Sequence, residues 1–155
     1  MIVKINESNI NEAAKIYMLS WKDSHKEICS AEFIEKHDLT YMKNFLNNKI
    51  KELYDIYIYY ADKNPVGIVG INPDDEEICL LYILPEEQGK GFGTKLLDHA
   101  LSFCKNPYIT VLDTNTKAID FYTKRGFFPA ENQKENSEEK RIFERKYVYQ
   151  KRNMW

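Results

Sequence analysis

The glycine-rich stretch Gln88-Gly89-Lys90-Gly91-Phe92-Gly93 is the part of this sequence that most directly suggests chemistry. It follows an apolar run that ends at Pro85, and it opens a segment with helical spacing of apolar residues. Glycine allows positive φ and lets a ligand approach the backbone without a Cβ in between. The first N–H groups of the following helix are unpaired and lie at the positive end of its dipole. This arrangement predicts a binding site for a phosphate or diphosphate group.

Two common phosphate-binding motifs do not fit this stretch. A P-loop needs GxxxxGK followed by Ser or Thr, which the segment does not supply. A dinucleotide-binding GxGxxG motif would need glycine at the position of Thr94, and it belongs to a leading βαβ unit. The pattern that remains is Q-x-x-G-x-G, placed directly after a strand and a proline.

This pattern resembles the acetyl-coenzyme A (acetyl-CoA) signature of the GNAT family of N-acetyltransferases. A second segment, Asn115–Phe127, is similar to the family's downstream motif N-x-x-A-x-x-F-Y-x-x-x-G-F. The resemblance covers residues 54–130 in specific motifs, and the earlier part of the chain only in layout. It implies one domain over residues 1–155 that moves an acetyl group from acetyl-CoA to a primary amine.

The resemblance also implies which residues contact the cosubstrate. The pantetheine arm would pair with the strand before the glycine turn, and the diphosphate would accept hydrogen bonds from the turn itself. Asn115 would add a contact, act as a helix N-cap, or do both. The implied cofactor-binding residues are Leu81, Tyr82, Ile83, Gln88, Gly89, Lys90, Gly91, Phe92, Gly93, Thr94 and Asn115.

For catalysis, the resemblance implies direct attack of the amine on the thioester through a tetrahedral intermediate. A backbone N–H near Ile83 would stabilise the oxyanion, and Tyr122 matches the family tyrosine that protonates the leaving thiolate. An ammonium must first lose a proton to a base. Glu77 matches one branch of the family and is the base we favour; Asp113 is a further candidate. Thr110 stands where other members carry a glutamate.

Two alternatives stay open at this point. Cys79 could carry a covalent acetyl intermediate, which would give ping-pong kinetics. The chain could also bind acyl-CoA as a sensor or regulatory module without turnover. The presence of Tyr122 argues against that second alternative, and Thr110 argues for it.

Composition excludes several other classes of function. A chain of 155 residues with net charge −2 suits one domain without a polyanion-binding surface, so nucleic acid is not an expected partner. No apolar run is long enough for a membrane span, and no signal peptide precedes the first strand. The cysteines show no metal-binding spacing, so we expect no metal and reduced thiols in a cytoplasmic protein. Monomer and homodimer both stay open, with Tyr147–Trp155 as a candidate dimer contact.

Helices and strands must position these residues, and the hydropathy pattern predicts where they lie. Residues 2–5 alternate like a strand, and residues 9–51 follow helical spacing. The expected N-caps are Asn9 with Glu12 as a capping box, then Ser30, then Asp38 or Thr40. Later strands are predicted at 54–61, 66–71, 77–84, 108–112, from 126 and at 141–149, with helices over 96–104 and 116–124 and a polar loop or hairpin tip at 131–141. The expected fold is α+β in α/β/α layers, a mixed and mostly antiparallel sheet flanked by helices.

The amine acceptor should meet the predicted helices between residues 21 and 50. Their aromatic and acidic side chains could hold a cationic amine, although core packing and a solvated helix face explain them as well. These residues are Trp21, Tyr41, Phe45, Glu27, Glu32, Glu35 and Asp38. The histidines, His25, His37 and His99, stand outside the motif positions and are expected to be surface or packing residues.

Overall fold

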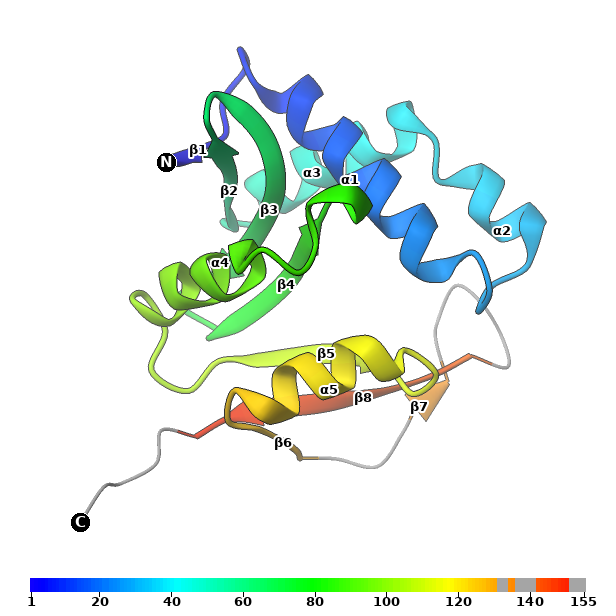
Figure 1. Cartoon of the computed structure of the whole chain (residues 1–155), viewed down its shortest axis with the longest axis vertical. Coiled ribbons are helices and arrows are strands. Elements are labelled where there is room, and N and C mark those ends of the chain that lie inside the picture. The colour runs from blue at the N-terminus through cyan, green and yellow to red at the C-terminus, as the bar shows by residue number, and fades with distance from the viewer. Residues whose placement is uncertain (131–133, 136–141, 151–155) are drawn as a thin grey trace.

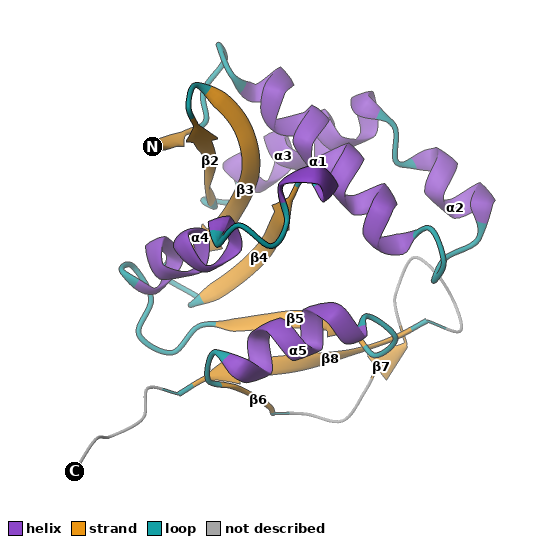
Figure 2. Cartoon of the chain, viewed as in Figure 1, coloured by secondary structure: helices purple, strands orange, loops and turns teal. Residues whose placement is uncertain are grey.

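The structure is a computed structural model, and it describes residues 1–130, 134–135 and 142–150. These residues form an eight-stranded sheet with helices on both of its faces (Figures 1 and 2). The strand order is β1-β2-β3-β4-β5-β8-β6, with β7 paired to β8. The β4–β5 pair is parallel and the other pairs are antiparallel, which confirms the predicted α+β class and the mixed, mostly antiparallel sheet.

The first half of the chain holds a short strand, a group of helices and a meander. Its elements are β1 (Ile2–Lys4), α1 (Ile10–His25), α2 (Ala31–Lys36), α3 (Leu39–Lys51), β2 (Asp55–Ala61), β3 (Asn64–Asn72) and β4 (Glu77–Ile83).

The second half crosses from β4 to β5 through a helix. Its elements are the 3₁₀ turn η1 (Pro85–Glu87), α4 (Phe92–Leu101), β5 (Tyr108–Leu112), α5 (Thr116–Lys124), β6 (Phe127–Pro129), β7 (Lys134–Glu135) and β8 (Phe143–Tyr149). The predicted polar segment 131–141 therefore contains the short strand β7, and its other residues lie outside the described part of the chain.

Helix caps agree with the sequence at two of the three predicted starts. The Ser30 hydroxyl accepts the N–H of Phe33 at 3.2 Å, and the Asp38 carboxylate accepts the N–H of Tyr41 at 2.8 Å. The capping box predicted at Asn9 is wrong. The Asn9 side chain instead accepts the N–H of Asn6, because the loop before α1 folds back on it.

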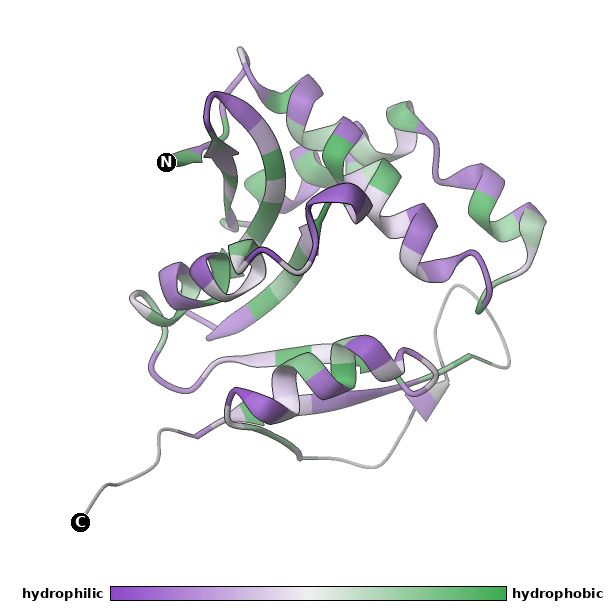
Figure 3. Ribbon diagram, viewed as in Figure 1, coloured by the Kyte–Doolittle hydropathy of each residue, from purple (hydrophilic) through white to green (hydrophobic). Residues whose placement is uncertain are grey.

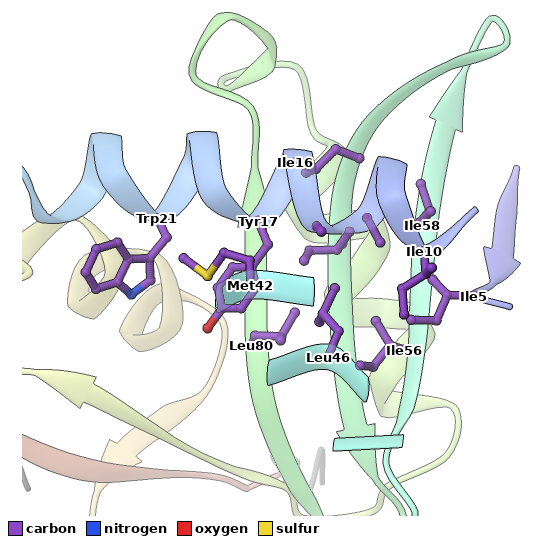
Figure 4. Close-up of a cluster of buried hydrophobic side chains, with 13 residues drawn as sticks. Ile5, Ile10, Ile16, Tyr17, Trp21, Met42, Leu46, Ile56, Ile58 and Leu80 are labelled. Carbon is purple, nitrogen blue, oxygen red and sulfur yellow. The ribbon is translucent and has the colours of Figure 1, made fainter. Parts of the chain in front are cut away.

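Alternate residues of β3 feed two separate hydrophobic cores. Ile68 packs with α1 and α3 on one face of the sheet, while Val69 packs with α4 and α5 on the other. Figure 4 shows the first of these cores, with Tyr17 and Trp21 of α1 beside Met42 and Leu46 of α3. Since both faces are covered, β3 and β4 are largely hydrophobic along their length (Figure 3).

None of the helices in the described part of the chain is long and apolar enough to cross a membrane. The C-terminal segment proposed from the sequence as a dimer contact lies partly outside the described residues. The described part of this segment packs against the rest of the chain: Tyr147 is buried, and the ring centroids of Tyr149 and Phe127 lie 5.4 Å apart.

Candidate active site

Strands β4 and β5 are paired only where both begin. The pair consists of Glu77 and Tyr108, and it is closed by a hydrogen bond of 2.8 Å from the Tyr108 N–H to the Glu76 carbonyl. Beyond this point the strands diverge (Figure 1). The Leu84 N–H donates to β3, so alternation turns the backbone groups of Leu81 and Ile83 toward the opening. The edge of β4 can therefore pair with an extended ligand.

A β-bulge bends β4 at the start of this opening. Gly70 of β3 pairs with Leu80, while the next residue, Ile71, pairs with Ile78, so Cys79 is the extra residue. A Cβ at Gly70 would lie 2.8 Å from the Cys79 sulfur. Glycine at this position thus makes room for the bulge that turns β4 away from β5.

A cavity of about 710 Å³ lies between the diverging strands. Its walls come from β4, β5, the glycine turn, α5 and the helices α1, α2 and α3. Most of the predicted site residues line it: Leu81, Tyr82, Ile83, Gln88, Gly89, Gly91, Phe92, Gly93, Thr94, Thr110, Asn115 and Tyr122. Lys90, Glu77 and Asp113 are not part of this lining.

The glycine turn at one end of the cavity has the open backbone that the sequence predicts. Gly89 and Gly91 have φ of 79° and 87°, and a Cβ at either position would meet nothing within 4 Å. Gly91 is the N-cap of α4 and provides no side-chain cap. The N–H groups of Phe92, Gly93 and Thr94 consequently have no partner within the helix.

Gln88 supports the turn from inside. Its Nε2 donates to the Ile83 carbonyl at 3.1 Å, and its Oε1 accepts a hydrogen bond from Lys117. The Lys90 side chain pairs instead with Glu87 at 3.0 Å. Gln88 therefore links the end of β4 to α5. Because the Lys90 side chain is paired with Glu87, we expect any contact of Lys90 with the cosubstrate to come from its backbone.

Two basic residues at this end were missed from the sequence. Lys117 and Arg125 both line the cavity, one at each end of α5. The Arg125 Nε donates to the Thr94 hydroxyl at 3.1 Å, and its guanidinium stacks on Phe121 at 3.9 Å. Both residues lie within the Asn115–Phe127 motif, and this position could have indicated that they lie near the cosubstrate. Placed beside an open helix N-terminus, these cations favour an anionic ligand.

Tyr122 lies on the buried side of α5 and faces the cavity. Its ring packs against Phe121 and Phe127 at 5.1 and 5.2 Å, and its hydroxyl has no hydrogen-bond partner among the described residues. Burial raises the pKa of Tyr122, and the Tyr82 phenol raises it further. The phenol consequently stays protonated near neutral pH and is available as a hydrogen-bond and proton donor.

The two carboxylates predicted as candidate bases, Glu77 and Asp113, do not line the cavity. Glu77 accepts a hydrogen bond from the Tyr54 hydroxyl, whose pKa is raised mainly by burial and also by this carboxylate. Asp113 lies 3.9 Å from the Arg145 guanidinium. Of the positions considered for the base, Thr110 is the one that lines the cavity, and it has no basic side chain. The catalytic role of Glu77 stays a prediction.

The other end of the cavity is walled by aromatic rings from the N-terminal helices. Tyr17 packs against Tyr82 of β4 at 5.4 Å and against Phe45 of α3 at 5.5 Å. One turn further along α1, Trp21 is stacked between His25 and His37. The aromatic residues that the sequence left between core packing and an acceptor site pack with the core and also line the cavity, and their contact with an acceptor stays a prediction.

Two of the three histidines line the cavity. His25 and His37 pack on Trp21, which agrees with a packing role, but both also line the cavity. His99 lies outside the cavity, against Tyr57 at 4.4 Å. The spacing of residues in the sequence could not indicate that His25 and His37 line a cavity, because their contacts with Trp21 depend on how α1 packs against the end of α2.

Comparison with known proteins assigns the family. The model of the Acetyltransferase (GNAT) family matches residues 13–127, which is most of the chain. The chain belongs to the GNAT acetyltransferase family. The matched region covers the glycine turn and reaches the end of the second motif, so the resemblance found in the sequence is confirmed.

Relatives of this GNAT chain include the peptidyl-lysine N-acetyltransferase YjaB from two bacteria. The protein from Salmonella typhimurium is 26% identical over 128 residues, covering 82% of this chain and 84% of its own. The protein from Escherichia coli is 27% identical over 131 residues, covering 82% and 83%.

Solved structures show the same fold at lower identity. The PaiA N-acetyltransferase from Thermoplasma acidophilum, determined in complex with coenzyme A, has a TM-score of 0.74 at 22% identity and covers 94% of this chain and 96% of its own. The apo form of E. coli YjaB has a TM-score of 0.74 at 23% identity and covers 96% of both chains.

Family membership makes this GNAT chain an acetyltransferase with acetyl-CoA as its cosubstrate. The open edge of β4, the glycine turn and the nearby cations fit a ligand with an amide-containing arm and a diphosphate. Within the described residues, no group of three or more His, Cys, Asp or Glu side chains is arranged to hold a metal ion.

Proposed function

We propose that this protein acetylates a primary amine, the side-chain amine of a lysine on a protein, by direct attack on acetyl-CoA. The observation that carries the proposal is the continuous cavity, which has the glycine turn at one end, Tyr122 on its wall and an aromatic wall from α1–α3 at the other end. A cosubstrate and an acceptor can enter such a cavity from opposite ends and meet beside β4.

Acetyl-CoA would bind with its pantetheine arm along Leu81–Ile83. The arm carries amides that can pair with the backbone groups turned toward the opening, as an added strand does. Its diphosphate would accept hydrogen bonds from the N–H groups at the start of α4, close to Lys117 and Arg125. Asn115 caps α5 through the Ala118 N–H at 3.2 Å, so its proposed cosubstrate contact would come in addition to that cap.

The chemistry is a transfer of the acetyl group from sulfur to nitrogen. The neutral amine attacks the thioester carbonyl, a C–N bond forms, and the oxyanion takes a hydrogen bond from the backbone N–H of Ile83. The C–S bond then breaks, and the thiolate takes a proton from the Tyr122 hydroxyl. Tyr122 recovers a proton from the nitrogen of the intermediate, which becomes the amide.

Direct attack is favoured over a covalent enzyme intermediate by the state of Cys79. Burial raises the pKa of this thiol to about 12, although Lys49 opposes the shift. A thiol with that pKa supplies little thiolate at neutral pH, and thiolate is the nucleophilic form. Ping-pong kinetics with a trapped acetyl group on Cys79 would contradict the proposal.

The lysine acceptor is supported by the YjaB relatives, which are named as peptidyl-lysine N-acetyltransferases. A lysine side chain is long and unbranched, so it can reach past the aromatic wall while its peptide stays outside. Aromatic faces can also hold the ammonium as it enters.

The test combines a binding and a turnover measurement on the same protein. Calorimetry with coenzyme A should show binding, and thiol release from acetyl-CoA should be fastest on a lysine peptide in a panel that includes an N-terminal amine and a polyamine. Tight coenzyme A binding with no release on any amine would instead favour a non-catalytic acyl-CoA sensor. Absence of coenzyme A binding would remove the proposal altogether.

A further inference from the structure

The acceptor end of the cavity holds two histidines that the reaction above does not use. His25 ends α1 and His37 follows α2, and both are buried, with exposed fractions of 6% and 5%. The indole of Trp21 lies between them, with ring centroids 4.2 Å and 3.9 Å away and interplanar angles of 11° and 13°. We call these three rings the His–Trp–His stack.

Hydrogen bonding fixes which nitrogen of His37 carries the hydrogen. Its Nδ1 lies 2.8 Å from the Phe33 carbonyl, which can only accept, so Nδ1 carries the hydrogen and donates. The neutral ring then keeps its lone pair on Nε2. The His37 side chain lines the cavity, and Nε2 makes no hydrogen bond to a described residue, so its lone pair is available to a ligand that enters there.

His25 is a poor proton acceptor near neutral pH. Its Nδ1 lies 2.8 Å from the Trp21 carbonyl, and burial lowers the pKa of this imidazole to about 4. Among the described residues, His25 lies across the indole from His37 and the Tyr41 ring of α3 lies 4.4 Å away, while Cys29 also lines the cavity. Asp38, the next residue, uses its carboxylate to cap α3.

The carboxylates near the cavity are placed elsewhere or engaged. Glu87 pairs with Lys90 at the cosubstrate end, and Glu144 of β8 takes part in another interaction. Glu77 lies outside the lining and accepts the Tyr54 hydroxyl. His37 therefore offers a basic lone pair at the acceptor end.

We propose that Nε2 of His37 accepts the proton that the acceptor ammonium must lose before it attacks acetyl-CoA. This inference rests on the proposed amine acetyltransferase function. An N–H bond of the ammonium breaks, the proton moves to Nε2 to form an imidazolium, and the electron pair left on nitrogen forms the C–N bond. The imidazolium returns its proton to solvent after the thiol, protonated by Tyr122, has left.

The dependence of kcat/KM on pH with a lysine peptide tests this role. In the wild-type protein, kcat/KM should level off well below the pKa of the free amine, because the enzyme removes the proton itself. In His37→Gln the value should be about 100-fold lower at neutral pH. It should also keep rising toward the pKa of the free amine, about 10.4, because only neutral amine reacts.

Matched variants separate chemistry from packing. Coenzyme A affinity should be unchanged in His37→Gln, His25→Gln should keep the levelling-off, and free imidazole should restore rate to His37→Ala. Three outcomes would overturn the inference and leave the proposed function standing. The first is a wild-type pH profile in His37→Gln, and the second is loss of the levelling-off in Glu77→Gln but not in His37→Gln. The third is no imidazole rescue in a His37→Ala protein that still binds coenzyme A. A wild-type protein that releases no thiol on any amine would overturn both.

Discussion

At the scale of single residues, Tyr122 owes its suitability as a donor to what surrounds it. Burial beside the Phe121 and Phe127 rings removes water from its phenol, and this desolvation disfavours the phenolate. A phenol in water ionises near pH 10, and the raised pKa keeps this one protonated to still higher pH. Its hydroxyl is also uncommitted among the described residues, so it can turn toward a leaving sulfur.

The substitution Tyr122→Phe should lower kcat by about 100-fold because it removes the proton donor but keeps the ring. The contacts to Phe121 and Phe127 remain, so coenzyme A affinity and the free energy of unfolding should change little. Steady-state kinetics and calorimetry on the same preparation measure the two quantities. An unchanged kcat would remove Tyr122 from the reaction.

At the scale of elements, the site is a junction between β4 and α4. The bulge at Cys79 bends the strand, Gln88 ties the end of the strand to α5, and the left-handed Gly91 starts the helix without a side-chain cap. The same turn that begins α4 therefore leaves its first N–H groups open to a ligand. Gly93 contributes in another way, since a Cβ there would lie 3.3 Å from the Phe121 ring of α5, and glycine avoids this tight contact.

Replacement of Gly91 by Leu should weaken coenzyme A binding by at least about tenfold, or 1.4 kcal/mol, because its side chain enters the space left for the ligand. The residue would also be strained at φ of 87°, at a cost of about 1–2 kcal/mol in stability. Gly91→Asn is the control, because Asn tolerates this conformation better and should cost less stability while still obstructing the ligand. Wild-type affinity in both variants would contradict the assignment of the diphosphate site.

At the scale of the whole molecule, one sheet joins two cores and holds the cavity between its diverging strands. The His–Trp–His stack lines the α1–α3 side of the cavity, and it includes a histidine buried in its neutral form. The pKa of His25 is lowered from an ordinary 6.5 to about 4, mainly by burial. At mildly acidic pH, His25 is therefore protonated in the unfolded chain but not in the folded chain. The free energy of unfolding consequently decreases as the pH falls.

We expect the free energy of unfolding to be highest above about pH 6.5 and to fall as the pH drops toward 4, with His25 contributing on the order of 3 kcal/mol. Urea unfolding at several pH values measures this slope. Carboxylates also titrate in this range, so His25→Gln is the reference that retains their contribution. An equal slope in wild type and His25→Gln would show that His25 does not cause it.

The sequence alone determined the class of fold and most of the order of elements, and it predicted the glycine turn that we propose binds the cosubstrate. The glycine turn, the helix after it and the Asn115–Phe127 motif are local, because positive φ, an open helix N-terminus and an N-cap all depend on neighbours within a few residues. For the same reason the caps at Ser30 and Asp38 were predicted correctly. The organisation of residues 1–155 as one domain and the cytoplasmic location stay predictions.

Tertiary structure decided the acceptor end of the site. The cavity exists because β4 and β5 are paired only at Glu77 and Tyr108, and no pattern in either strand specifies where they diverge. His25 and His37 meet across Trp21 only when α1 and the end of α2 pack together, and Glu77 is left outside the lining by its place at the closed end of the same strands. Such contacts join residues distant in the chain, and their geometry follows from packing rather than from spacing.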